Sequence, residues 1–277
     1  MENKDFAVFI LTHGRPDNVK TLSTLKKCGY TGRVYFIVDN EDRAIGQYQK
    51  NYGHEYVKIF DKKVIAEKVD EGNNFDNRKV IIHARNACFE IAKDLGITYF
   101  VQFDDDYYYF GYRYINEKKI IKNLDSVFDS MLEFYKSTNI KSICFSQGGD
   151  HIGGFSGIKL KRKAMNSFFC SIDRPFQFIG SINEDVNTYT SLGCRGDLFF
   201  TFTNIQLDQK DTQSNRGGMT DEYALTGTYV KSFHSVMMHP SGVKVSMMNA
   251  NNVRLHHSIK WNNTTPMIIS DKYKKNV

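Results

Sequence analysis

The sequence lacks the features that would place the protein in a membrane or in an oxidising compartment. No stretch approaches the roughly 18 uninterrupted apolar residues of a transmembrane helix, and the first residues run into an apolar segment without a signal-peptide pattern. The five cysteines are widely spaced and include no Cys-x-x-Cys pair, which argues against a zinc site and a disulfide framework. We therefore expect a cytoplasmic protein with reduced cysteines and no membrane association.

Two common phosphate-binding signatures are also missing. The sequence contains neither Gly-x-Gly-x-x-Gly nor Gly-x-x-x-x-Gly-Lys-Ser/Thr, so it has neither a dinucleotide fingerprint nor a P-loop. If the protein binds a phosphorylated ligand, it must do so by other means, and a metal ion is the simplest. The net charge of +6 lies below the strongly basic range that by itself indicates nucleic acid, so it permits a polyanionic partner without requiring one.

Apolar runs alternate with helical patterns along the first half of the chain. Strands are predicted over 6–11, 34–38, 56–60, 99–103 and 142–146, and helices over 16–28, 44–52, 81–95 and 124–135. This alternation indicates an α/β fold with a mostly parallel central sheet flanked by helices. No repeat or interdomain linker is present, and 41% hydrophobic content in 277 residues supports a sizeable core. We expect a single domain over residues 1–277.

One apolar segment ends abruptly in three consecutive aspartates. Residues 99–103 supply Tyr, Val and two Phe, and Asp104, Asp105 and Asp106 follow at the carboxyl end of the predicted strand, where ligands bind in open α/β sheets. Adjacent carboxylates repel one another, and a hard cation such as Mg²⁺ or Mn²⁺ relieves this repulsion and bridges to substrate phosphates. We interpret the triplet as a metal site, with a solvated acidic turn as the alternative.

Further polar residues lie at predicted strand ends and helix starts. Asp39 follows the strand over 34–38. Arg85 and Asn86 lie near the start of the helix over 81–95, where they either contact a nucleotide diphosphate or form an ordinary surface pair. Later, a glycine-dense stretch over 147–157 precedes a basic cluster of Lys159, Lys161, Arg162 and Lys163. Such glycines allow close backbone approach to a ligand, and the basic cluster is either a solvated face or a phosphate contact.

These residues resemble the GT-A type (Rossmann-like) glycosyltransferases, and more closely the phage TET-associated glycosyltransferases that attach sugars to hydroxymethylated pyrimidines in DNA. The resemblance covers most of the chain. It rests on an ordered set of motifs, namely Leu11-Thr-His-Gly-Arg-Pro16, Val38-Asp39, Ala84-Arg-Asn86, Phe103-Asp-Asp-Asp-Tyr107, Gln147-Gly-Gly-Asp150, Lys161-Arg-Lys-Ala-Met-Asn-Ser-Phe-Phe-Cys170, Ile182-Asn-Glu-Asp-Val186, Thr212-Gln-Ser-Asn-Arg-Gly-Gly-Met219 and Arg254-Leu-His-His257.

The resemblance implies a donor site in residues 1–146 and an acceptor-binding and catalytic half in residues 147–277. In this fold an Asp-x-Asp motif holds a divalent metal, Mn²⁺ or Mg²⁺, on the diphosphate of a nucleotide sugar, here expected to be a UDP-sugar. Asp104 and Asp106 are the expected metal ligands, and Asp104 and Asp105 are expected to contact the nucleotide sugar. By position, Thr12, Arg15 and Asp39 are candidates for the uridine site.

The resemblance also implies a general base and a further metal ligand. The acidic pair in Asn183-Glu-Asp-Val186 resembles the motif whose carboxylate acts as base in inverting members of the fold, with Asp185 as first choice and Glu184 as second. A helix N-terminus that favours acidic residues through its dipole explains the same pair, and both interpretations can hold together. Either His256 or His257 is expected to complete the metal shell through a ring nitrogen.

The expected acceptor is the hydroxymethyl group of a 5-hydroxymethylpyrimidine, with hydroxymethylcytosine preferred, in double-stranded DNA of an infected bacterial host. Lys161, Arg162 and Lys163 are the candidates for contact with the DNA backbone. We expect the target nucleotide to be extruded and stacked on aromatic side chains. Two other functions stay open at this point, a nucleotidyltransferase of related fold and a catalytically silent DNA-binding module.

Overall fold

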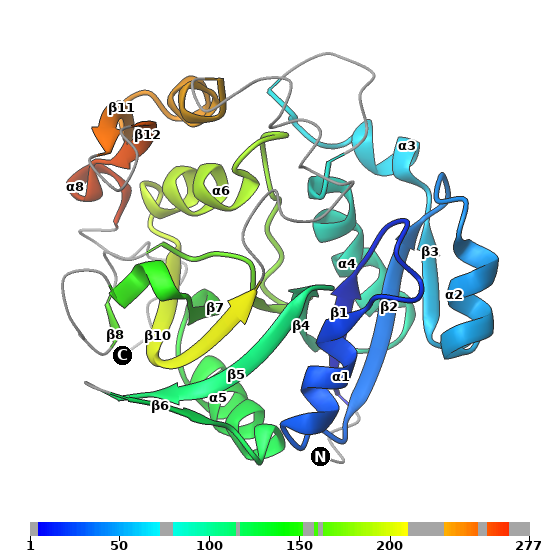
Figure 1. The fold of residues 1–277 in the computed structure, drawn as a ribbon. Coiled ribbons are helices and arrows are strands. Elements are labelled where there is room, and N and C mark those ends of the chain that lie inside the picture. Colours follow the sequence, from blue (N-terminus) through cyan, green and yellow to red (C-terminus); the bar gives the residue numbers. More distant parts are fainter. Residues whose placement is uncertain are drawn as a thin grey trace.

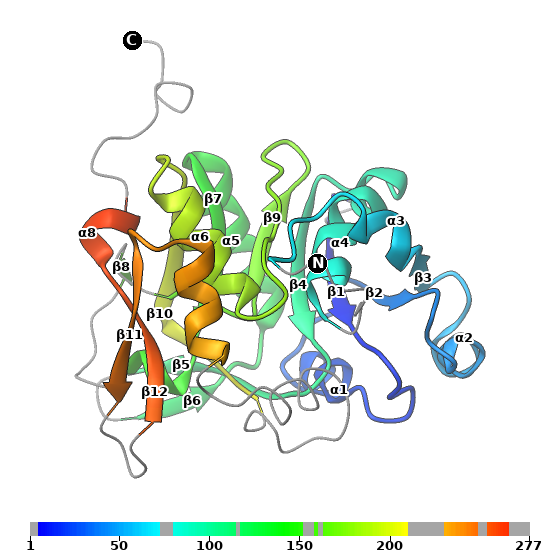
Figure 2. The same ribbon diagram turned by 90° about the horizontal axis from the view of Figure 1, so that it is seen from above.

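The computed structural model describes residues 5–72, 80–114, 117–151, 158–159, 163–209, 230–248 and 254–265. Within these ranges ten strands form one sheet in the order β3-β2-β1-β4-β9-β7-β10-β5-β6, with β8 paired to β10, and β11 and β12 form a separate hairpin (Figures 1 and 2). The strands are β1 (Phe6–Leu11), β2 (Arg33–Asp39), β3 (Val57–Phe60), β4 (Tyr99–Asp104), β5 (Tyr107–Arg113), β6 (Lys118–Ile120), β7 (Ile140–Ser146), β8 (Ile158–Lys159), β9 (Phe168–Ser171), β10 (Leu198–Gln209), β11 (Val243–Met248) and β12 (Arg254–Ile259).

The main sheet is mostly parallel, as the alternation in the sequence predicts. Strands β3, β2, β1 and β4 pair in parallel, and so do β7 and β10. Strand β9 lies between β4 and β7 and is antiparallel to both, so β4 and β7 run in the same direction. Strand β5 is antiparallel to β10. The carboxyl ends of β1, β2 and β4 therefore meet at one edge of the sheet.

Helices cover both faces of the sheet (Figure 1). They are α1 (Lys20–Lys27), α2 (Ile45–Tyr52), α3 (Lys62–Ala66), α4 (Ile82–Asp94), α5 (Leu124–Ser137), α6 (Glu184–Gly193) and α8 (Trp261–Thr264), with a 3₁₀ turn at Gly148–His151, and residues 230–238 are also helical. None of the helices in the described ranges is long and apolar enough to cross a membrane.

Two buried clusters, one on each face, form the core. Successive residues of β1 face opposite sides, as the geometry of a strand requires: Val8 and Ile10 pack with α1, α2 and α5, whereas Ala7 and Phe9 pack with α3, α4 and α6. Every residue of β1 is buried. This explains why the predicted central strands are continuous apolar runs and not alternating ones.

The elements of the first half match the predicted ones closely. The strand over 6–11 is confirmed without change, and the helix over 81–95 is observed at Ile82–Asp94. One difference is that the first helix begins at Lys20 and not near Pro16. Residues 12–19 instead form a loop at the carboxyl edge of the sheet.

Candidate active site

The aspartate triplet begins on the last residue of β4 and is held by the start of α1. The Thr21 hydroxyl donates a hydrogen bond to the Asp104 carbonyl oxygen at 2.6 Å, and the Thr21 backbone N–H donates to the Asp105 carbonyl at 3.1 Å. The Tyr107 N–H donates to the same Thr21 hydroxyl at 3.0 Å. These bonds fix the turn between β4 and β5, so the three carboxylates leave a backbone that is tied to the core.

Asp105 points inward and is bound by the loop after β1. Its side chain is 2% exposed, accepts a hydrogen bond from the Thr12 hydroxyl at 2.7 Å and pairs with the Arg15 guanidinium at 3.3 Å. Thr12 also lies 2.8 Å from the hydroxyl of Tyr48 on α2. Burial raises the pKa of Asp105 to about 6, although Arg15 and Thr12 oppose that shift. Two predicted donor-site residues, Thr12 and Arg15, therefore meet the triplet.

Asp39, at the end of β2, has a cationic environment. It accepts a hydrogen bond from His13 Nδ1 at 2.6 Å, and the Lys62 ammonium lies 3.4 Å from its second oxygen. Burial alone would raise the pKa of Asp39, but the hydrogen bond from His13 and the charge of Lys62 outweigh it and hold that pKa below its usual value. The same hydrogen bond raises the pKa of His13, which is half exposed. Asp39 is therefore anionic at neutral pH, beside a ring that is accessible to solvent.

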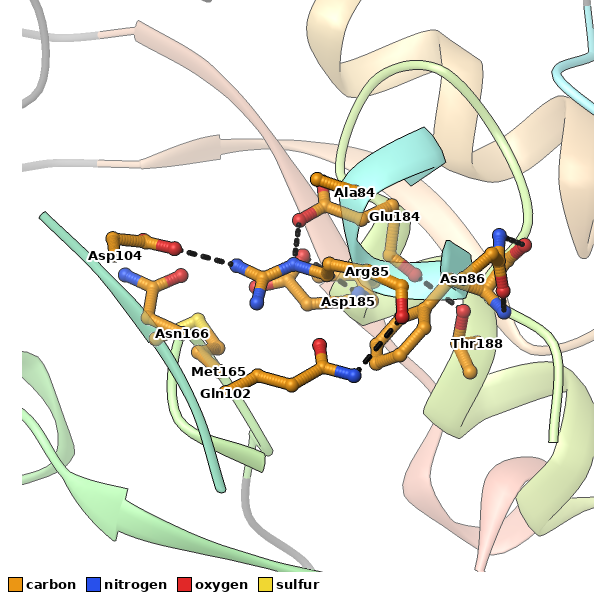
Figure 3. A network of polar contacts seen from close by, with 12 residues as sticks. Ala84, Arg85, Asn86, Gln102, Asp104, Met165, Asn166, Glu184, Asp185 and Thr188 are labelled. Carbon is orange, nitrogen blue, oxygen red and sulfur yellow. Dashed lines mark hydrogen bonds and ion pairs between the residues drawn. The ribbon is translucent and has the colours of Figure 1, made fainter. Parts of the chain in front are cut away.

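Arg85 connects the triplet to the acidic pair on α6. Its guanidinium is 1% exposed and pairs through Nη2 with Asp104 at 3.1 Å and through Nε with Glu184 at 2.9 Å, as Figure 3 shows. The aromatic rings of Phe168 and Phe178 lie 5.2 Å and 5.8 Å from it. Although burial opposes the charged form, the two carboxylates raise the pKa of Arg85. The cation is thus permanent, and it brings two segments that are distant in sequence into one site.

The acidic pair begins α6 behind an unusual residue. Asn183 adopts a left-handed backbone conformation with φ of 54°, which non-glycine residues rarely adopt. Its side-chain amide donates to the Lys231 carbonyl at 2.8 Å and to the Ser235 hydroxyl at 3.0 Å, so the helix over 230–238 holds this turn in place. Such local strain is concentrated at functional sites. It directs the two following carboxylates into the interior.

The two carboxylates of the pair have different partners. Glu184 is engaged by Arg85, whereas Asp185, which is 9% exposed, accepts a hydrogen bond from the Val186 N–H at 2.7 Å. Burial and the neighbouring charge of Glu184 raise the pKa of Asp185 to about 6. A carboxylate of this kind accepts a proton more readily than an ordinary aspartate does. Figure 3 shows Asp185 beside the Arg85 side chain.

The triplet supplies the carboxylate oxygens that a hard divalent cation prefers as ligands. Burial and mutual repulsion raise the pKa of Asp104 to about 6, against the charge of Arg85, and burial and Asp105 raise the pKa of Asp106. Within the described ranges, no three His, Cys, Asp or Glu side chains lie close enough together to hold a metal ion. A cation at Asp104 and Asp106 would therefore take its other ligands from substrate phosphates and water, which is the usual coordination of Mg²⁺ at phosphate sites.

His256 and His257 lie on β12 and face Lys163. Their Nε2 atoms are each 3.4 Å from the Lys163 ammonium, and the ring centroids are 4.2 Å apart. Burial and the charge of Lys163 lower the pKa of His257 to about 2, so this ring is neutral. The charge of Lys163 also acts on Asp185, which it holds toward the ionised form. A metal role for either histidine stays a prediction, and it would require the ammonium to move away from the ring nitrogens.

The remaining predicted residues fall into two groups. The Asn86 side chain is engaged by the backbone of Phe178, donating to the carbonyl oxygen at 3.0 Å and accepting from the N–H at 2.8 Å, so it fixes the segment before α6. Lys161 and Arg162 lie outside the described residues.

Taken together, these contacts place most of the predicted site residues along one edge of the sheet. They are Thr12, Arg15, Asp39, Arg85, the triplet and the acidic pair.

Several residues of the site were not singled out from the sequence. They are His13 and Lys62, which bind the Asp39 carboxylate, Thr21, which bonds the Asp104 backbone carbonyl, and Tyr48, which bonds the Thr12 hydroxyl. Only His13 had a visible signal, because it lies within the motif Leu11-Thr-His-Gly-Arg-Pro16. The other three come from helices whose side chains meet the strand ends only in the folded chain.

Comparison with protein families matches residues 6–218 to the TET-associated glycosyltransferases, which confirms the resemblance seen in the sequence. No curated protein sequence matches the chain. Among solved structures, glucosyl-3-phosphoglycerate synthase from Mycobacterium tuberculosis, in complex with Mn²⁺, uridine diphosphate and phosphoglyceric acid, aligns at 11% identity and a TM-score of 0.45, over 93% of this chain and 87% of that one. S. aureus TarS (residues 1–349) aligns at 11% identity and a TM-score of 0.43, over 73% of this chain and 60% of that one.

Proposed function

Because the chain belongs to the TET-associated glycosyltransferase family, we propose that it transfers a sugar from a UDP-linked donor to the hydroxymethyl group of a 5-hydroxymethylpyrimidine in DNA, with hydroxymethylcytosine as the preferred base. The observation that carries the proposal is the Arg85 bridge. It joins the aspartate triplet to the Glu184–Asp185 pair. A site for the leaving group and a site for the attacking hydroxyl are thereby held at a fixed relation to each other.

The donor is assigned to the edge formed by the loop after β1 and the ends of β2 and β4. Asp39 is anionic and lies close to an accessible imidazole, a combination suited to hydrogen bonding with a uracil ring or ribose hydroxyls. Arg15 pairs with Asp105 and keeps 28% of its side chain exposed, so it is available to a diphosphate. A divalent cation held by Asp104 and Asp106 would offset the negative charge that develops on the departing nucleoside diphosphate.

Asp185 is assigned as the general base. Glu184 is occupied by its ion pair with Arg85, while Asp185 has no ion-pair partner among the described residues and has a raised pKa of about 6. A base works best when its pKa lies near the working pH, because it is then mostly ionised and still basic enough to remove a proton. Glu184 would keep the buried Arg85 compensated through the reaction.

The acceptor is assigned from the family, with charge as secondary support. The net charge of +6 is compatible with a DNA partner. A hydroxymethyl group on pyrimidine C5 lies in the major groove, so reaching the buried Asp185 requires the nucleotide to leave the stack. The extruded base would then enter between β4 and α6.

Mass spectrometry of nucleosides tests this proposal directly. Hydroxymethylcytosine-containing DNA is incubated with the protein, Mn²⁺ and a panel of UDP-sugars, then digested to nucleosides. The proposal predicts a mass increase of one sugar on hydroxymethylcytosine and release of UDP, with no product from unmodified DNA of the same sequence.

Two other outcomes would replace the proposal. Release of pyrophosphate from a nucleoside triphosphate would identify a nucleotidyltransferase, and DNA binding without any turnover would identify a silent binding module. Transfer to a protein or lipid acceptor in place of DNA would overturn the acceptor and leave the transferase chemistry intact.

A further inference from the structure

A second surface, on the hairpin formed by β5 and β6, combines exposed aromatic rings with basic side chains. We call residues 107–114 and 117–120 the tyrosine hairpin. It begins directly after the aspartate triplet and forms an outer edge of the main sheet (Figure 1). Tyr108, Tyr112 and Tyr114 have exposed fractions of 54%, 37% and 46%. A tyrosine side chain has a large apolar area and a polar tip. Covering rings as exposed as these with a binding partner therefore contributes favourable free energy.

The hairpin carries a surplus of positive charge. Residues 107–122 contain Arg113, Lys118, Lys119 and Lys122 and a single acidic residue, Glu117. Arg113 lies directly opposite Lys118 in the β5–β6 register, and like charges in that position destabilise a sheet. Lys118 is compensated by Asp208 at 3.0 Å, whereas Arg113 has no ion-pair partner within the described part of the chain. An anion outside the chain would relieve this repulsion.

Rings and cations are also close to one another. The Lys119 ammonium lies 5.4 Å from the Tyr114 ring centroid, and the Lys118 ammonium lies 5.8 Å from that of Tyr109. Lys119 is paired with exposed Glu117, and such surface pairs contribute little stability. Lysines on an edge strand also prevent sheet-to-sheet aggregation, but this role does not require the three exposed tyrosines. Stacking rings beside exchangeable cations are the features that bind bases and phosphates of a single strand.

We propose that the tyrosine hairpin binds the single-stranded stretch of DNA next to the nucleotide that enters the active site. The inference rests on the proposed DNA acceptor. From Tyr108 to Tyr114 the hairpin spans roughly 20 Å at strand geometry, which is long enough for several nucleotides. It starts at the residue after Asp106, so a strand lying along it leads away from the site. Bases stack on Tyr108, Tyr112 and Tyr114, while phosphates contact Lys119, which lies opposite Tyr112 and therefore on the same face of the hairpin.

Binding of a fluorescently labelled, unmodified single-stranded oligonucleotide tests the proposal without any need for turnover. The double variant Tyr112→Ala/Tyr114→Ala should lose about tenfold or more in affinity, because each base–aromatic stack contributes strongly, whereas Tyr112→Phe should bind like the wild type. Lys119→Ala should reduce the slope of log K against log salt by about 0.7, which corresponds to one phosphate contact. The matched controls are Tyr56→Ala and Lys58→Ala at the opposite edge of the sheet, where Tyr56 is 43% exposed, and both should bind normally.

The outcomes separate this inference from the proposed function. Unchanged oligonucleotide affinity in the double variant, or an equal loss in Tyr56→Ala, would overturn the hairpin assignment, as would a loss confined to duplex DNA. Loss of oligonucleotide binding in the double variant alone would support it, even if hydroxymethylated DNA proved not to be the acceptor. A further outcome is that the double variant transfers sugar to hydroxymethylated DNA at the wild-type rate when DNA is subsaturating. This result would support the proposed enzyme function and would show that the hairpin does not contribute to it.

Discussion

The molecule holds two groups of carboxylates of the same chemistry in two different environments. The triplet at Asp104–Asp106 lies at the end of a strand, with the Asp104 side chain 22% exposed and Arg15 and Arg85 nearby. The pair at Glu184–Asp185 begins a helix whose first seven residues are all buried. One cation, Arg85, contacts both groups.

The two environments suit the two groups of carboxylates to different chemical roles. Carboxylates that are partly open and mutually repelling are suited to hold an external cation. A carboxylate that is buried and not ion-paired is suited to take a proton. Active sites commonly contain pairs of acidic side chains whose different surroundings give them different catalytic roles. The following predictions test whether the two groups of this protein are divided in that way.

The largest expected effect is the loss of activity in Asp106→Ala. Removing a metal ligand leaves the leaving diphosphate poorly compensated, so we expect kcat to fall by about 10³-fold or more. Turnover is measured by UDP release, and the matched control is Asp129→Ala on the exposed face of α5. Wild-type rates in excess EDTA would contradict the division of roles, because the triplet would then need no cation.

Asp185→Asn should lower the transfer rate by about 10²–10⁴-fold with nucleotide-sugar binding nearly unchanged, because the amide keeps the shape of the side chain and loses its basicity. The wild-type rate should decline as the pH falls through about 6, where both Asp185 and the candidate metal ligand Asp104 become protonated. Initial rates and donor affinity by calorimetry give the two readouts. If Asp185→Asn were fully active and Glu184→Gln inactive, Glu184 would be the base.

Arg85→Met tests the link between the two groups. Removing one partner of a buried ion pair leaves uncompensated charge, so we expect the free energy of unfolding to drop by about 3–5 kcal/mol. Urea denaturation at neutral pH measures it, with Arg195→Met at an exposed position as the control. A decrease of less than about 1 kcal/mol in the free energy of unfolding would show that the charges of Asp104 and Glu184 do not depend on Arg85 for compensation.

The smallest expected effect is on thermal stability. The folded-state pKa of Asp185, about 6, lies above its usual value, so the folded protein binds this proton more tightly than the unfolded chain does. Below about pH 4 the Asp185 carboxyl therefore does not change the free energy of unfolding. As the pH rises from about 4 through 6, it lowers that free energy increasingly. Asp185→Asn should raise the melting temperature by a few degrees at pH 8 and leave it unchanged at pH 4. Equal differences at both pH values would place the effect in packing and not in ionisation.

Much of the structure of residues 1–146 follows from the sequence because its signals are local. The apolar run before the triplet is long enough to specify β4, and the structure ends that strand at Asp104. The pattern over 81–95 predicts α4, but not that Arg85 turns inward and becomes 1% exposed, since a charged residue near a helix start is usually at the surface. Its burial depends on two acids, one of which is Glu184, far along the chain.

Long-range pairing explains the other differences. Strand β9 is only four residues long, and nothing within it specifies an antiparallel place between β4 and β7. Lys163 belongs to a basic run that predicts contact with DNA, yet the folded chain turns its ammonium toward two histidines of β12. In both cases the decisive partner lies on a distant segment, which periodicity and composition do not encode.

The insertion of β9 also sets an order of events during synthesis. Strands β1 to β4 are complete once Asp104 has left the ribosome, but the outer edge of β4 stays unpaired until Phe168–Ser171 follows. An unpaired strand edge is a template for wrong association, and chains fold as they emerge, N-terminal parts first. The strand that ends in the aspartate triplet therefore has an exposed edge in the nascent chain, and pausing between these two points would prolong the interval in which that edge needs protection.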